Sequence, residues 1–128
     1  MANAQRLRRL ADQIQLEISA MLATELRDPR LSLVTITEVR VAQDLAHARV
    51  YYTTLLDGAA RDDVARGLER SSGFMRSLLG RRIRTHVTPD LHFEYDRSIE
   101  HGMAIDRLIE SAIAEERPDQ ADDGATAG

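Results

Sequence analysis

Residues 70–84 read RSSGFMRSLLGRRIR, and the two faces of this stretch organise the rest of the chain. At the helical spacing of about 100° per residue, its apolar residues share one broad arc, which we expect to be buried. The members of this arc are Phe74, Met75, Leu78, Leu79 and Ile83. The opposite arc holds small and basic residues, namely Gly73, Arg76, Ser77, Gly80 and Arg84, with Arg81 on its flank. The stretch therefore predicts an amphipathic helix with a bare, basic side.

The two glycines of this helix require an explanation, because each costs about 1 kcal/mol relative to alanine in a helix interior. One explanation is a phosphate backbone that lies close to the bare surface and pairs with the interspersed arginines. The other is that the glycines let another element of the protein pack closely, while the arginines form a solvated face. The stretch alone leaves both explanations open.

The net charge of −4 conceals a polarised chain. Residues 64–84 hold six arginines and one acid, whereas residues 85–114 hold six acids and two arginines. Residues 115–128 hold five acids and one arginine, with small residues and glycine at the end. We expect one folded domain over 1–115, followed by an acidic, disordered tail over 116–128.

The composition also excludes several classes of protein. The 128 residues contain no cysteine, so there is no disulfide framework and no cysteine-ligated metal, which fits a reducing cytoplasm. No apolar stretch approaches the ~20 residues of a membrane span, and the start, MANAQRLRRL, lacks the apolar run of a signal peptide. We therefore expect a cytoplasmic protein that does not enter a membrane and holds no cofactor or metal.

The chain before the central stretch predicts a helix and a β-hairpin. Asn3 is suited to cap a helix over about residues 4–26, which LRDPRL ends because Pro29 disfavours the helical conformation of the preceding residue. Residues 33–42 and 47–55 then form two antiparallel strands, with a bulge near Thr37 where the apolar phase changes. The start of the first helix carries a second basic cluster, formed by Arg6, Arg8 and Arg9.

A second helix over about residues 59–71 meets the central stretch at Ser71-Ser72-Gly73. Two serines and a glycine favour a kink, since serine competes for backbone hydrogen bonds and glycine loosens the turn. A kink would expose free amide groups at the start of the next helix, where an anion could bind. We therefore expect Arg70, at the kink, and the amides after Ser72 to contribute to a phosphate site.

A third strand and a last helix follow the central stretch. Leu91, Phe93 and Tyr95 alternate with polar residues as a strand. The last helix, over about residues 99–115, is expected to pack through its apolar residues, which are Ile99, Met103, Ile105, Ile109 and Ile113. The order α-β-β-α-kink-α-β-α predicts an α+β fold with a three-stranded sheet covered on one face by helices.

A catalytic or metal site is the weaker interpretation of the third strand. His92, Glu94 and Asp96 share one face of it, and His86 or His101 could lie nearby. The same residues would also suit a solvated outer sheet face, in which Arg49 or His47 pairs with Glu94 or Asp96. No histidine pair has helical ligand spacing and no glycine-rich phosphate loop is present, so we expect no enzyme.

The order and spacing of several segments resemble the ribosome-binding factor A family. These segments are LRDPRL, VTITEVRVAQDLAHARVYYT, SGFMRSLLGRRIR and TPDLHFEYD followed by SIEHGM, within about residues 4–113. The resemblance implies a type II KH-like fold in which a kink with an A-x-G pattern replaces the usual GxxG loop. Ser71-Ser72-Gly73 is the equivalent here, with a serine in place of the family alanine.

The resemblance further implies a bacterial assembly factor for the small (30S) ribosomal subunit. Such a factor binds 16S rRNA, assists late maturation and 5′-end processing without cleaving RNA itself, and supports growth in the cold. We expect a monomer whose partners are the immature subunit, its rRNA and assembly GTPases. The alternative is an adaptor that docks on ribosomal proteins through the acidic sheet face and the last helix. The RNA-binding residues expected are Arg6, Arg8, Arg9, Arg70, Ser71, Ser72, Gly73, Arg76, Ser77, Gly80, Arg81 and Arg84.

Overall fold

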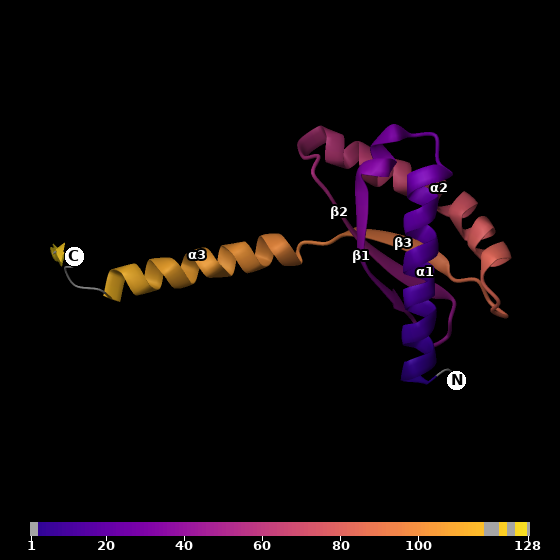
Figure 1. The fold of residues 1–128 in the computed structure, drawn as a ribbon, viewed down its shortest axis with the longest axis horizontal. Coiled ribbons are helices and arrows are strands. Elements are labelled where there is room, and N and C mark those ends of the chain that lie inside the picture. Colours follow the sequence, from indigo (N-terminus) through magenta and orange to yellow (C-terminus); the bar gives the residue numbers. More distant parts are fainter. Residues whose placement is uncertain (1–2, 117–120, 123–124, 128) are drawn as a thin grey trace. The chain divides into compact units, whose positions relative to one another are not determined.

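The computed structural model describes residues 3–116, 121–122 and 125–127, and it divides the chain into two compact units (Figure 1). The first unit, Met1–Asp96, contains two long helices and a three-stranded sheet. The second unit, Arg97–Gly128, contains the last helix.

Helix α1 spans Ala4–Thr24 and begins at the predicted cap, since Oδ1 of Asn3 accepts a hydrogen bond from the Arg6 amide at 2.8 Å. Its buried stripe follows the helical period and comprises Ala11, Ile14, Ile18, Met21 and Leu22. The 3-10 helix η1, Pro29–Leu33, follows the end of α1 and buries Leu31. The LRDPRL segment thus ends the helix as predicted.

The sheet has the order β1-β2-β3, formed by strands Val34–Val41, His47–Thr54 and Asp90–Tyr95. Strands β1 and β2 are antiparallel, and their register shifts between Ile36 and Glu38, which confirms the predicted bulge at Thr37. Strand β3 lies parallel to β2, so the sheet is mixed. Both strands of the hairpin and the third strand lie where the sequence places them, and the predicted α+β architecture is confirmed.

Helix α2 spans Gly58–Arg82 without interruption. The sequence predicts two helices that meet at a kink at Ser71-Ser72-Gly73, but the structure has one helix through these residues, so the expectation of two separate helices is wrong. Since the backbone amides after Ser72 lie inside one helix, they are not the free groups of a new helix N-terminus. The Ser72 hydroxyl donates to the Glu69 carbonyl oxygen at 2.8 Å, and this local bond is accommodated within the helix.

The core lies between one face of the sheet and the helices α1 and α2. The sheet contributes Ile36, Val39, Ala48, Val50, Tyr52 and Leu91, and α2 contributes Val64, Leu68, Met75 and Leu79. Four of the five apolar residues predicted to be buried in the central stretch are buried or half-buried. Phe74 is the exception, because half of its surface (50%) is exposed.

The second unit contains helix α3, Ser98–Glu116, and two short antiparallel strands, β4 (Ala121–Asp122) and β5 (Ala125–Ala127). The apolar side chains predicted to pack are exposed by 45–52%; these are Met103, Ile105, Ile109 and Ile113. The side chain of Ile99 lies outside the described residues, as does most of the segment predicted to be a disordered tail. Among the helices described, none is long and apolar enough to cross a membrane.

Candidate nucleic-acid interface

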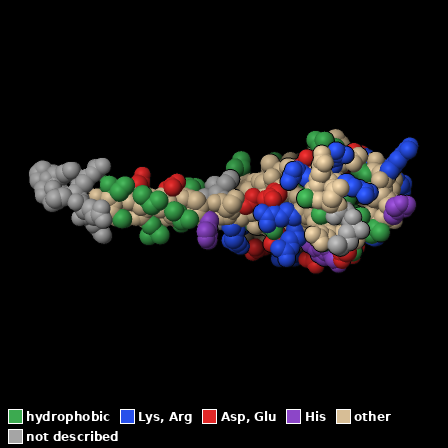
Figure 2. All heavy atoms as spheres, turned by 90° about the horizontal axis from the view of Figure 1, so that it is seen from below, with side chains coloured by type: hydrophobic (Ala, Val, Ile, Leu, Met, Phe, Trp, Pro, Cys, Tyr) green, Lys and Arg blue, Asp and Glu red, His purple; other side chains and the backbone are tan. Residues whose placement is uncertain are grey.

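An exposed stripe runs along helix α2 on the side away from the core. Its members recur at helical spacing and are all exposed: Arg66, Arg70, Gly73, Phe74, Ser77 and Arg81. Five of these six residues belong to the central stretch, whereas the predicted site residues Ser71 and Ser72 are half-buried at its edge. Figure 2 shows arginine side chains standing out from the surface of the first unit on the face that it draws. We call these six residues the α2 stripe.

Phe74 is a member of the stripe that sequence reasoning missed. An exposed aromatic ring among arginines is the combination that single-stranded nucleic acids favour, since bases stack on the ring while guanidinium groups hold phosphates. The signal is present in the sequence, because Phe74 lies only about 40° around the helix from Arg70. The set of apolar residues expected to be buried therefore includes one residue too many, Phe74.

The two glycines of the central stretch have different surroundings. A β-carbon added at Gly73 would have no atom within 4 Å, so the helix surface there is open. A β-carbon added at Gly80 would lie 2.9 Å from Oγ1 of Thr88. The second explanation, close packing of another element, therefore applies to Gly80, whereas Gly73 leaves an open helix surface.

The side chain of Arg76 is held within the protein. Its Nε atom donates to the carbonyl oxygen of Thr88 at 3.0 Å and forms an ion pair with Oδ1 of Asp90, also at 3.0 Å. These contacts attach the loop before β3 to helix α2. A phosphate would have to compete with Asp90 for this guanidinium group, so Arg76 is less available to a ligand than Arg70 or Arg81.

A groove brings the second basic cluster to the end of the central stretch. Arg6 and Arg9 of α1 and Arg84 after α2 share this groove, whose volume is about 550 Å³. Leu10, Gln13, Leu45, Thr85 and His86 complete its lining. The sequence expected Arg6, Arg8 and Arg9 to act together, but Arg8 is not among the lining residues. We call this site the basic groove.

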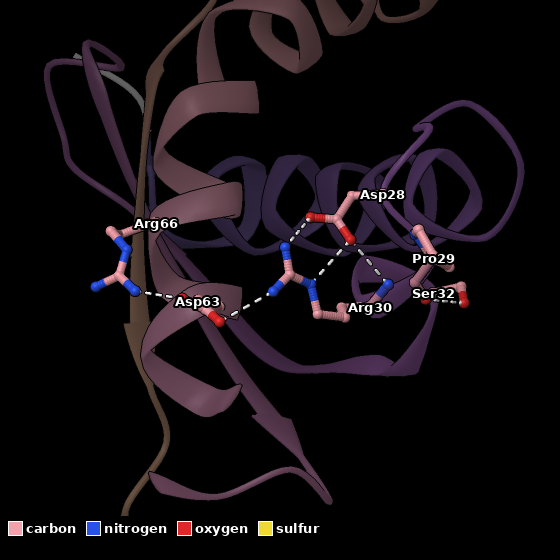
Figure 3. A network of polar contacts seen from close by, with 6 residues as sticks. All are labelled: Asp28, Pro29, Arg30, Ser32, Asp63 and Arg66. Atoms are coloured by element: carbon pink, nitrogen blue, oxygen red, sulfur yellow. Dashed lines mark hydrogen bonds and ion pairs between the residues drawn. The ribbon is translucent and has the colours of Figure 1, made fainter. Parts of the chain in front are cut away.

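The LRDPRL segment forms a polar network that joins η1 to α2 (Figure 3). Arg30 lies between two carboxylates, with Nη2 3.1 Å from Oδ2 of Asp28 and Nη1 3.0 Å from Oδ2 of Asp63. Asp63 also pairs with Arg66 of the α2 stripe. The hydrogen bonds from the Arg30 side chain and amide lower the pKa of Asp28 below its ordinary value. This network links η1 to α2 through ion pairs and so helps to hold α2 in place.

The outer face of the sheet carries charges that pair across strands. Nε of Arg49 lies 3.6 Å from Oε2 of Glu94, which confirms one of the predicted cross-strand pairs. Nδ1 of His47 and Nε2 of His92 lie 3.0 Å apart. Within the described ranges, no three His, Cys, Asp or Glu side chains come together as metal ligands would. The arrangement is that of a solvated sheet face.

Comparisons with known proteins agree on one family. The model of the family described as ribosome-binding factor A matches residues 6–109. Ribosome-binding factor A of Thiobacillus denitrificans is 50% identical over 111 residues, which cover 87% of this chain and 90% of that protein. The protein of the same name from Azoarcus sp. is 42% identical over 118 residues, 92% of this chain and 94% of that protein.

Solved structures of similar fold bear the same description. The crystal structure of ribosome-binding factor A from Thermus thermophilus has a TM-score of 0.63 at 27% identity and covers 70% of this chain and 94% of that chain. The solution structure of a Thermotoga maritima protein described as a putative ribosome-binding factor A has a TM-score of 0.61 at 31% identity. It covers 73% of this chain and 90% of that chain. A homology model of the Thermus thermophilus factor, fitted into a cryo-electron-microscopy map of its complex with the 30S subunit, has a TM-score of 0.60 at 27% identity. It covers 71% of this chain and 96% of that chain.

Proposed function

The chain belongs to the ribosome-binding factor A family, and from this premise we propose that it is a non-catalytic factor that binds the RNA of the small ribosomal subunit. The relative from Thermus thermophilus that was fitted into a map of a 30S complex supports this partner. The fold supplies a basic helix surface but, in the described part of the chain, no metal-ligand cluster.

The observation that supports the proposal best is a set of arginines without ion pairs in the described part of the chain, one at the end of the α2 stripe and three in the basic groove. Arg81 ends the stripe and Arg84, three residues later, enters the groove beside Arg6 and Arg9. Among the described residues, none of these four arginines takes part in an ion pair. Guanidinium groups left free in this way suit the phosphates of RNA, to which they donate two hydrogen bonds at once.

The open helix surface at Gly73 supports close approach of the RNA backbone to α2. Ser77 lies one turn further along the same stripe and offers a hydroxyl group to a phosphate oxygen. Phe74, between them, offers an aromatic face to an unpaired base. Arg76 and Gly80 contribute indirectly, because both hold the loop that carries Thr88 against the helix.

The finer biological role follows from the same premise. We propose that the protein acts late in small-subunit maturation, assists 16S rRNA 5′-end processing without cutting RNA, and supports growth in the cold. It would act in the cytoplasm as a monomer and leave the subunit with the help of an assembly GTPase.

Co-sedimentation with small subunits from cells that lack the protein tests the proposal. We expect the full chain to sediment with these subunits, and an excess of free 16S rRNA fragments to release it. Failure to sediment would contradict subunit binding. Sedimentation that free rRNA cannot reverse would contradict RNA as the ligand.

An adaptor that docks on ribosomal proteins is the second candidate function. It is favoured by the exposed apolar side chains of α3, among them Leu108, which is 70% exposed, since exposed apolar groups often mark protein-binding surfaces. The competition experiment separates the two functions, because free rRNA would not displace a protein bound only to ribosomal proteins.

A further inference from the structure

The basic groove combines two kinds of lining. Three guanidinium groups come from Arg6, Arg9 and Arg84, while Leu10 and Leu45 are aliphatic. No carboxylate is among the lining residues, so nothing within the groove neutralises the arginines. Its volume of about 550 Å³ is within the range of pockets that hold small molecules. A ligand that fits this lining is anionic at one end and flat or apolar at the other.

Leu45 reaches this groove from an unusual backbone conformation. Its φ is 62°, in the left-handed region that leucine rarely adopts, and no other non-glycine residue among those described has a positive φ. The turn is fixed from both sides, since the Leu45 amide donates to the Ala42 carbonyl oxygen and the Ala46 amide donates to Oδ1 of Asp44, each at 2.9 Å. A glycine would form this turn more easily, so the leucine side chain is present at a cost in backbone strain.

We propose that the basic groove holds one unpaired ribonucleotide, with its phosphates on Arg6, Arg9 and Arg84 and its base against Leu45. This inference rests on the RNA-binding function proposed above and names the subsite that binds. The imidazole of His86 offers a ring on which the base stacks, and the Gln13 amide offers hydrogen bonds to the base or sugar. Unpaired RNA fits better than a duplex, because only an unpaired base can leave its stack and enter a groove.

Arg9 and Arg8 provide a matched pair of variants, since they are consecutive in α1 and both exposed, but only Arg9 lines the groove. Binding is measured by fluorescence anisotropy of the full chain with a labelled single-stranded hexaribonucleotide at several salt concentrations. We expect Arg9→Ala to weaken binding several-fold and to lower the salt slope by about 0.7, the value for one phosphate contact on a single strand. The affinity of Arg8→Ala should stay within about twofold of that of the unaltered protein, because only a long-range electrostatic attraction to the RNA is lost. Equal losses in both variants would overturn the groove as the binding site.

Leu45→Gly tests the base contact. The substitution removes the side chain from the groove and relieves the positive φ, so the melting temperature should stay the same or rise. We expect affinity for the hexaribonucleotide to fall several-fold with an unchanged salt slope, because no charge is lost. Leu55→Ala is the control, since Leu55 is fully exposed and does not line the groove. Unchanged affinity in Leu45→Gly would overturn the base contact.

Inorganic tripolyphosphate distinguishes a nucleotide site from a simple anion site. If it displaced the hexaribonucleotide from the unaltered protein as effectively as unlabelled RNA of the same length, the groove would bind phosphate alone, and the proposal would fail. If the hexaribonucleotide did not bind but the protein still sedimented with small subunits, the groove proposal would fail while the proposed function stood. Loss of both would contradict the proposed function itself.

Discussion

Gly80 packs directly against Thr88, so that a β-carbon at position 80 would lie 2.9 Å from the threonine Oγ1. Seven residues earlier in the same helix, Gly73 has no neighbour within 4 Å of the equivalent point. The two glycines therefore serve different purposes. Gly80 lets the loop before β3 lie on the helix, and Gly73 leaves the helix surface bare.

The same substitution at the two glycines should change stability in opposite directions. Gly73→Ala should raise the free energy of unfolding by up to about 1 kcal/mol, because alanine is the better helix former and meets open space. Gly80→Ala should lower it by about 1 kcal/mol, since overpacking against Thr88 outweighs the gain in helix propensity. Urea denaturation measures both. Adding Thr88→Ala to Gly80→Ala should restore stability, and failure of this rescue would show that the contact with Thr88 is not the cause.

Phe74 and Met75 are neighbours in sequence but lie in opposite environments. Met75→Ala should cost about 3 kcal/mol, because this side chain is fully buried. Phe74→Ala should cost no more than about 1 kcal/mol of stability, yet weaken binding to single-stranded RNA through loss of base stacking. Thermal unfolding and RNA anisotropy on the same samples separate the two effects. A large loss of stability in Phe74→Ala would place this ring in the core instead of in the α2 stripe.

The bonds from Arg30 to Asp28 should make stability depend on pH in the acidic range. Because folding lowers the pKa of Asp28, its contribution is present above the unfolded value, near 3.8, and is lost as the pH falls through the folded value. Asp28→Asn should cost up to about 1 kcal/mol at pH 7, because the ion pair with Arg30 is lost although asparagine can still cap η1. The difference between the two proteins should shrink below about pH 4. Denaturation of both proteins across the range from about pH 2.5 to 7 measures this difference in the free energy of unfolding. A difference that does not change with pH would contradict a contribution from the ionised Asp28 carboxylate.

The fold was largely predictable because it depends on local patterns. The cap at Asn3, the bulge at Thr37 and the strand alternation of Leu91 and Phe93 follow from residue type and spacing, and all were found. The division into two helices at Ser71-Ser72-Gly73 was not found, since one helix of 25 residues runs through this segment.

The candidate site was predictable only in part, because availability depends on tertiary contacts. Helical spacing placed Gly73 and Ser77 on one exposed face with Arg81 on its flank, and the structure has all three in the α2 stripe. Nothing in the spacing showed that Thr88 and Asp90 would hold Arg76. Likewise, only the packed structure joins Arg84 to the start of α1 in one groove.

Arg76 and Arg84 should differ in their effect on binding. Arg76→Ala should mainly loosen the loop before β3, with a lower melting temperature and little change in the salt dependence of subunit binding. Arg84→Ala should leave the melting temperature nearly unchanged, since Arg84 is exposed. It should lower the salt dependence of subunit binding, because Arg84 lines the groove. Differential scanning fluorimetry and co-sedimentation, run in parallel, check both expectations. A reversed pattern would mean that phosphate binds at Arg76.

The salt dependence of binding to small subunits tests the account most directly. The association constant of the full chain is measured by co-sedimentation at increasing KCl concentrations. The proteins compared are the unaltered chain, the double variant Arg81→Ala/Arg84→Ala and the control variant Arg40→Ala. Arg40 is a suitable control because it lies on the outer face of the sheet. We predict that the double variant lowers the slope of log K against log salt by about 1 to 1.5, because two phosphate contacts are lost, while the control keeps it. An unchanged slope in the double variant would contradict RNA binding by this surface.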